Sequence, residues 1–287
     1  MSSGVNRLPH DPQRGQTVRV GLTIAFDGSA YAGWQVQKTG TAVQEKIEAA
    51  LARLFPSSPR LHGSSRTDAG VHALGLVAHF DLPRAEWRMP VRKLVIALNA
   101  WLPPDIRVSD ARRVRPDFHA RFSAVSKQYR YFVWNHAAMN PLLRFTAWHV
   151  PRPLDLAAMQ NAASRFVGKH DFQALSANPG YKRPCMRRTV TRCEVRKRGS
   201  LLTFLLEADG FLYKMCRGIV GTLVQVGLGR FQPSEVNQIL AARDRRRAGM
   251  TAPAHGLVLW KVRYAKTGTL SPKPQTGLTA KLNDESE

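Results

Sequence analysis

The sequence has few cysteines, and their scarcity excludes two common ways of holding a fold together. Cys185, Cys193 and Cys216 are the three cysteines among 287 residues. Their number is odd and none lies in a CxxC pair, so neither a disulfide framework nor a zinc site is predicted. We interpret them as buried thiols of a protein in a reducing compartment.

Long apolar runs are also missing. No stretch approaches the roughly 20 apolar residues that span a bilayer, and the N-terminus lacks the apolar core of a secretory signal. A cytoplasmic protein that does not contact membranes is therefore expected. The sequence also contains no dinucleotide fingerprint, P-loop or metal-ligand cluster, so no cofactor and no metal are expected.

Acidic residues are scarce relative to basic ones. The chain has 20 Asp+Glu against 43 Lys+Arg, a formal net charge of +23 and a pI of about 11.0. Such a surface attracts a polyanion, and nucleic acid is the leading partner class. Ribosomal and membrane-surface proteins are equally basic, so charge alone does not separate an enzyme from a binding module.

The first half of the chain alternates strand and helix patterns. Apolar residues at every second position predict strands over 18–26, 74–81 and 106–114, with a short strand before Arg66. Helices are predicted from Thr41, where Thr41 and Gln44 have capping-box spacing, and from Pro90. The resulting order, β-α-β-β-α-β, is ferredoxin-like.

The second half repeats this order less regularly. Strands are predicted over 127–135, 188–197, 201–208 and 257–264, and helices over 156–167, 211–226 and 234–242. We expect an α+β fold in which two ferredoxin-like halves, 17–116 and 117–266, share a broad, mostly antiparallel sheet, with helices on one face and a basic RNA-binding cleft on the other. Residues 1–16 and 267–287 lack periodicity and are expected to be flexible tails.

The stretch from Gly63 to Asp81 reads GSSRTDAGVHALGLVAHFD and contains the leading catalytic candidate, Asp68. Taken alone, Thr-Asp-Ala-Gly is typical of an ordinary turn. RTDAGVHA followed by LGLVAHFD, however, resembles the signature of the tRNA pseudouridine synthase A family, in which this Asp is catalytic. The resemblance extends over about residues 18 to 264 and includes FDGSAYAGWQ and TAPAHGLVLW. It departs from the family at Phe26, Ser65 and Leu76.

Arg217 lies in the middle of the predicted helix 211–226, which is apolar on almost every side. A buried guanidinium needs an anion, and the sequence alone leaves Asp68, Asp209, Glu207 or contact with solvent open. FLYKMCRGIVG resembles the family segment whose Arg pairs with the catalytic Asp. The resemblance therefore implies an Asp68–Arg217 pair that holds Asp68 ionised and oriented as a nucleophile.

Two further residues have both a structural and a functional interpretation. The strand pattern of KQYRYFVWN predicts core packing for Tyr129, whereas the match to the family implies that its ring stacks on the target base. Arg66 is either a surface cation or, as the match implies, a residue that assists flipping of the target nucleotide.

Several segments are candidates for RNA contact. Phe118, His119, Ala120, Arg121 and Phe122 resemble the family's FHARF segment, which contacts RNA. Lys182, Arg183, Arg187 and Arg188 form a basic run. Basic runs are usually solvated faces, but in a chain of this charge we expect them to bind phosphates.

The resemblance implies isomerisation of uridines 38, 39 and 40 in the anticodon stem-loop of tRNA, without a cofactor, by a homodimer whose subunits tRNA bridges. Two alternatives stay open at this point. One is an RNA-binding module without catalysis, which would use the same basic surface. The other is a related synthase that acts on a different RNA, since the motif fixes the chemistry more firmly than the target.

Overall fold

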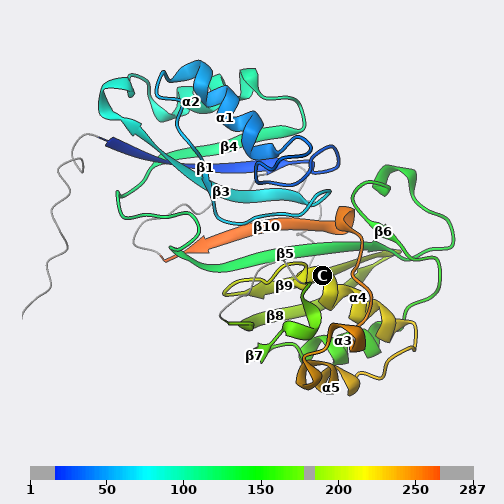
Figure 1. Cartoon of the computed structure of the whole chain (residues 1–287). Coiled ribbons are helices and arrows are strands. Elements are labelled where there is room, and N and C mark those ends of the chain that lie inside the picture. The colour runs from blue at the N-terminus through cyan, green and yellow to red at the C-terminus, as the bar shows by residue number, and fades with distance from the viewer. Residues whose placement is uncertain (1–16, 178–184, 266–287) are drawn as a thin grey trace, which may run out of the picture.

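The computed structural model describes residues 17–177 and 185–265, and within them one sheet extends through both halves of the chain (Figure 1). Its strands are β1 (Thr17–Phe26), β2 (His62–Gly63), β3 (His72–Pro83), β4 (Ile106–Arg113), β5 (Ala124–Trp134), β6 (Trp148–His149), β7 (Gly168–Asp171), β8 (Arg187–Arg198), β9 (Leu201–Ala208) and β10 (Leu257–Tyr264).

Five α-helices and five short 3-10 helices connect these strands in the described residues. The α-helices are α1 (Val43–Leu54), α2 (Val91–Trp101), α3 (Leu156–Ser164), α4 (Met215–Gly227) and α5 (Glu235–Ala242). The 3-10 helices are η1 (Arg84–Glu86), η2 (Pro141–Leu143), η3 (Gln173–Leu175), η4 (Arg245–Arg247) and η5 (Ala254–Gly256).

The strand order relates the two halves to each other. The main path is β4-β1-β3-β10-β5-β9-β8-β7, with β2 beside β3 and β6 beside β5. In β4-β1-β3-β2 and, with the short strands β6 and β7 set aside, in β10-β5-β9-β8, the last strand of each half lies beside the first, followed by the third and the second. The halves meet where β10 pairs in parallel with β3, at Val258 opposite His72 and Leu259 opposite Ala73. The predicted α+β class and broad, mostly antiparallel sheet are confirmed.

Two helices begin later than predicted. The cap of α1 is Ala42, which has no side-chain acceptor, so the predicted box of Thr41 and Gln44 was wrong; only Glu45 reaches back to the Ala42 amide, at 3.5 Å. The helix predicted from residue 211 begins at Met215, because Lys214 has a left-handed φ of 58° that no α-helix contains. Arg217 consequently lies in the first turn of α4 rather than in the middle of a helix.

Short elements were missed for a physical reason. β6 has two residues and β7 has four, too few for an alternating pattern to be recognised. α3 ends at Ser164, three residues before the predicted end at Val167, and the chain turns there into β7. The predicted tails, 1–16 and 267–287, lie outside the described residues.

The helices form two groups along the sheet (Figure 1). Tyr129 and Tyr131 point to the same side of β5, and Tyr131 is fully buried beneath the segment that contains Pro253. α1 and α2 lie near β1 and β4, while α3, α4 and α5 lie beside the second half (Figure 1). The two helix groups thus lie toward opposite ends of the strand order, and the basic cleft expected on the face opposite the helices stays a prediction.

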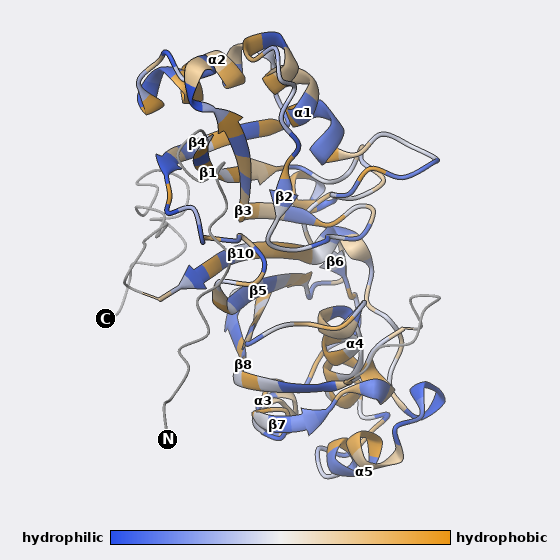
Figure 2. Ribbon diagram, turned by 60° about the vertical axis from the view of Figure 1, so that its left-hand side comes forward, coloured by the Kyte–Doolittle hydropathy of each residue, from blue (hydrophilic) through white to orange (hydrophobic). Residues whose placement is uncertain are grey.

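Helix α4 is the most buried helix and the most hydrophobic one in the second half (Figure 2). Arg217 and Gln225 are its only residues that are not buried. Of the cysteines, Cys193 and Cys216 are buried as expected, but Cys185, two residues before β8, is exposed, which corrects that part of the interpretation. No helix in the described part of the chain is long and apolar enough to cross a membrane.

Candidate active site

The connection between β2 and β3 contains Asp68, and a loop from the N-terminal part of the chain holds it in place. The Trp34 amide donates to the Thr67 carbonyl at 3.2 Å. Gly33 has a φ of +110°, and a Cβ there would lie 2.5 Å from the Thr67 carbonyl oxygen. Only glycine allows this approach, so the Gly33 backbone supports the residue directly before Asp68.

The end of the same motif is fixed by His72, the first residue of β3. Its Nδ1 lies 3.0 Å from the Gly28 amide nitrogen, and its Nε2 lies 3.0 Å from the carbonyl oxygens of Phe145 and His255. One buried ring thus connects three segments that are distant in the sequence. The position of Asp68 is therefore set by contacts on both sides of its loop.

Asp68 forms an ion pair with Arg217 across the two halves of the chain. Nη1 of Arg217 lies 2.8 Å from Oδ2 of Asp68, and the two side chains are 14% and 18% exposed. Nε of Arg217 donates to the Ala252 carbonyl at 2.7 Å, so the guanidinium is held at two points. The other two carboxylates that were candidate partners of Arg217 have different contacts: Glu207 accepts from the Ser126 hydroxyl, and Asp209 accepts from the Thr189 amide.

Close packing against α4 brings the Ala252 carbonyl within reach of Arg217. At Gly221 a Cβ would lie 1.7 Å from the Met250 carbonyl oxygen, so glycine is required for the segment after Met250 to lie against the helix. The Ala252 amide in turn donates to the Arg217 carbonyl at 3.0 Å. Because Arg217 lies in the first turn, its guanidinium extends from the positive end of the α4 dipole.

Tyr129 lies beside this pair and is 7% exposed. Its ring contacts Phe211 edge to face, with centroids 5.1 Å apart. Burial raises the pKa of the Tyr129 hydroxyl, and the nearby Cys216 and Asp68 raise it further. The phenol is therefore neutral, and Tyr129 offers an apolar ring next to the carboxylate while also packing in the core.

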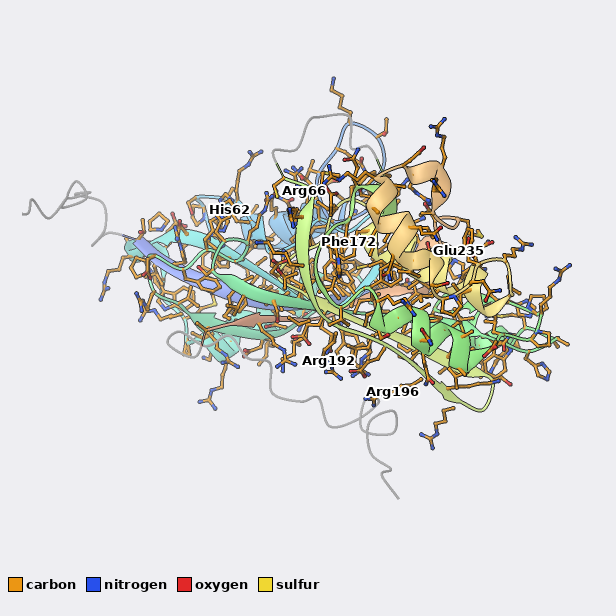
Figure 3. The ribbon with its side chains drawn as sticks, turned by 90° about the horizontal axis from the view of Figure 1, so that it is seen from below. His62, Arg66, Phe172, Arg192, Arg196 and Glu235 are labelled. Atoms are coloured by element: carbon orange, nitrogen blue, oxygen red, sulfur yellow. The ribbon has the colours of Figure 1, made fainter. Side chains whose placement is uncertain are left out.

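Arg66 lies two residues before Asp68 and is exposed. It makes no hydrogen bond or ion pair with another described residue. Figure 3 places Arg66 and His62 on one side of the sheet and Arg192 and Arg196 on the opposite side. An exposed guanidinium at the entrance to the site is available to a substrate.

Two histidines accept hydrogen bonds from the backbone of the FHARF segment, residues 118–122. Nδ1 of His79 accepts from the Ala120 amide at 3.2 Å, and Nδ1 of His119 accepts from the Arg121 amide at 3.1 Å. Burial, with Arg19 as the next cause, lowers the pKa of His79 to about 3, and burial also lowers the pKa of His119. Both rings therefore stay neutral acceptors at neutral pH.

Only part of this segment offers a surface to RNA. Arg121 and Phe122 are exposed, with the guanidinium carbon 5.4 Å from the ring centroid of Phe122, and His119 is half-buried. Phe118 and Ala120 are buried, and contact of this segment with RNA stays a prediction. They support the turn that presents the others.

The basic run on β8 is described in part. Arg187 is exposed and Arg188 is half-buried, with its Nη1 3.3 Å from the Cys185 carbonyl oxygen. Lys182 and Arg183 lie outside the described residues. No group of three or more His, Cys, Asp or Glu side chains that could hold a metal occurs in 17–177 or 185–265.

The sequence reasoning missed Lys127. Its Nζ donates to the Ser64 carbonyl at 2.6 Å, at the start of the Asp68 loop. The signal was present, because Lys127 precedes Tyr129 by two residues on a strand and so shares its face. A lysine on a strand is usually interpreted as a solvated residue, and for this reason it was not selected.

Comparisons with known proteins point to one family. The model of a family described as tRNA pseudouridine synthase matches residues 22–123 and 162–265, more than half of the chain. The chain is 43% identical over 248 residues to a tRNA pseudouridine synthase A of Exiguobacterium sp., covering 86% of this chain and 98% of the relative. It is 44% identical over 243 residues to the protein of that name from Methylacidiphilum infernorum, covering 85% and 94%.

Proposed function

The chain belongs to the tRNA pseudouridine synthase family, whose members isomerise uridine to pseudouridine in tRNA, and we propose that Asp68 is the nucleophile of this reaction. The observation that carries the proposal is the 2.8 Å pair between Asp68 and Arg217. A carboxylate that attacks must be oriented, and a guanidinium that bonds both Asp68 and the Ala252 carbonyl holds it in place.

The reaction breaks the bond between N1 of uracil and C1′ of ribose and forms a bond from C5 to C1′. The proton on C5 is lost to solvent and N1 gains one, so there is no net redox change and no group leaves the RNA. Attack of Asp68 on C1′ and attack on C6 of uracil both start from the same ionised carboxylate. In the first route C5 displaces the carboxylate from C1′, and in the second the carboxylate is eliminated from C6 after the C5–C1′ bond has formed, so it is regenerated in both.

Tyr129 and Arg66 have roles in delivering the base. The target uracil leaves the RNA stack and loses its stacking energy, which an aromatic ring beside the nucleophile replaces. Tyr129 has this place in the site. Arg66 is exposed and has no partner among the described residues, so it is free to fill the space that the flipped nucleotide leaves.

The proposed targets are uridines 38, 39 and 40 of the anticodon stem-loop. One pocket that serves neighbouring uridines selects RNA shape and backbone rather than base edges, and a net charge of +23 supports recognition of the backbone. His119, Arg121, Phe122, Arg187 and Arg188 are the described candidates for these contacts. We further propose a cytoplasmic homodimer whose subunits tRNA bridges, each subunit consisting of halves 17–116 and 117–266.

The substrate assignment is tested by mapping pseudouridine, position by position, in unmodified tRNA transcripts treated with the wild-type protein. Transcripts with a single uridine at 38, 39 or 40 are compared with transcripts that carry uridine only outside the anticodon arm. Conversion confined to the first set supports the proposal. Conversion confined to the second set would replace the target, and binding without conversion of any transcript would favour an RNA-binding module.

A further inference from the structure

Lys127 lies at the point where the catalytic loop meets cations from two other segments. It is partly buried on β5, two residues before Tyr129, and its ammonium group is bonded to the Ser64 carbonyl at 2.6 Å. The charges of Arg121, three residues before β5, and Arg188, on β8, act on it, and the sheet register places β8 nearby, since Lys127 and Val190 both pair with Ala208 of β9. Three positive charges therefore converge from three segments of the chain.

No carboxylate of the described residues neutralises Lys127. Its hydrogen-bond partner is a neutral carbonyl, and its charged neighbours carry the same sign. Burial, followed by the charges of Arg121 and Arg188, lowers the pKa of Lys127 to about 8. A partly buried ammonium group held next to two guanidinium groups is unfavourable unless an anion enters between them.

We propose that Lys127, Arg121 and Arg188 form a subsite for one backbone phosphate of the RNA, adjacent to the target uridine. The inference rests on the proposed function and adds a residue and a ligand group to it. Because residues in a strand rise about 3.3 Å each, a phosphate at Lys127 lies within about one nucleotide of a base stacked on Tyr129. The same ammonium group holds Ser64, so the phosphate contact and the loop of Asp68 are joined through one side chain.

The geometry favours a phosphate over a protein carboxylate. A group of cations suits a ligand with several acceptor oxygens, and guanidinium groups bind phosphate oxygens through paired donors. Phe122 lies against Arg121, and exposed aromatic rings beside cations are typical of surfaces that bind single-stranded or flipped nucleotides.

The test measures tRNA binding as a function of salt for wild type, Lys127→Met and Lys127→Arg. Methionine keeps the length of the side chain but removes the charge, and arginine keeps the charge. Each phosphate contact contributes about 0.7 to 0.9 to the slope of log K against log salt. We expect the slope to fall by about that amount in Lys127→Met and to be retained in Lys127→Arg. Arg196→Met, an equal loss of charge at a 73% exposed side chain on the opposite side of the sheet, is the matched control (Figure 3).

A second measurement locates the phosphate. Methylphosphonate is placed, one linkage at a time, at the phosphates around the target uridine. One position is expected to weaken binding of wild type and to leave the affinity of Lys127→Met unchanged. If Lys127→Met slows pseudouridine formation but shows the wild-type slope and the wild-type response at every linkage, Lys127 only supports Ser64 and the inference is overturned. Failure of wild type to form pseudouridine overturns the proposed function instead. The salt dependence of tRNA binding by wild type and Lys127→Met then still tests whether Lys127 binds a phosphate.

Discussion

Replacing Arg217 tests whether the carboxylate of Asp68 depends on its partner. Arg217→Gln removes the charge-assisted hydrogen bond to Asp68, which contributes about 1.5–3 kcal/mol. If that energy is used to orient the nucleophile in the transition state, the rate constant falls by about 10- to 150-fold, since 1.36 kcal/mol corresponds to a factor of ten. Arg217→Lys keeps the charge but has one nitrogen in place of the two with which Arg217 bonds Asp68 and the Ala252 carbonyl. Its rate should therefore lie between the rates of wild type and Arg217→Gln.

The assay is single-turnover release of tritium from C5-labelled uridine in tRNA at saturating protein. Arg230→Gln, an equivalent change just beyond the other end of α4 at an exposed side chain, is the control and should react at the wild-type rate. Urea unfolding is measured in parallel, because breaking a buried ion pair costs about 3 kcal/mol. A folded Arg217→Gln protein that reacts at the wild-type rate would refute the reasoning.

Two further predictions concern the supports of the site. Gly33→Ala should lower the free energy of unfolding, measured with urea, by over about 1 kcal/mol more than Gly229→Ala does. Both glycines have positive φ, but only a Cβ at Gly33 meets the Thr67 carbonyl. Equal losses of stability in the two variants would contradict this account of the loop. The pKa of His79 is about 3 in the folded protein and about 6.5 when unfolded. The unfolded state therefore binds more protons below pH 6.5, and the stability contributed by neutral His79 is lost as pH falls from about 6.5 to 3. The slope is up to about 1.4 kcal/mol per pH unit. His79→Asn keeps an acceptor for the Ala120 amide but does not titrate. Its free energy of unfolding should therefore depend less steeply on pH than that of wild type, by up to that amount. Identical pH dependence in the two proteins would contradict a neutral His79 in the folded state.

Most of the strands could be predicted from the alternation of apolar and polar residues in the sequence. Alternation in β1, β3 and β9 placed those strands to within a few residues, because half-buried strands show a period of two. The start of α4 could not be read in the same way. Phe211 and Leu212 continue the apolar pattern of the helix that follows, and the left-handed backbone at Lys214 separates them from it.

The candidate site was predictable where one short motif contains its chemistry. Asp68 and Arg217 lie in such motifs. The need of a buried guanidinium for an anion left Asp68, Asp209, Glu207 and solvent open as partners of Arg217, and the resemblance to the family selected Asp68. Burial within a motif was not predictable, since Phe118 and Ala120 differ from exposed Phe122 only in which side of a turn they occupy. Lys127 depends on contacts with Ser64, 63 residues away in the sequence, and such contacts have no local pattern.

The central claim is that Asp68 attacks the substrate, and one experiment addresses it most directly. Pseudouridine formation on unmodified tRNA transcript is measured for wild type and Asp68→Asn, with RNA binding measured for both. Asparagine has nearly the same shape but is not a carboxylate nucleophile. The account predicts that Asp68→Asn binds tRNA with wild-type affinity and forms no detectable pseudouridine. A variant that binds and still converts uridine at the wild-type rate would contradict it.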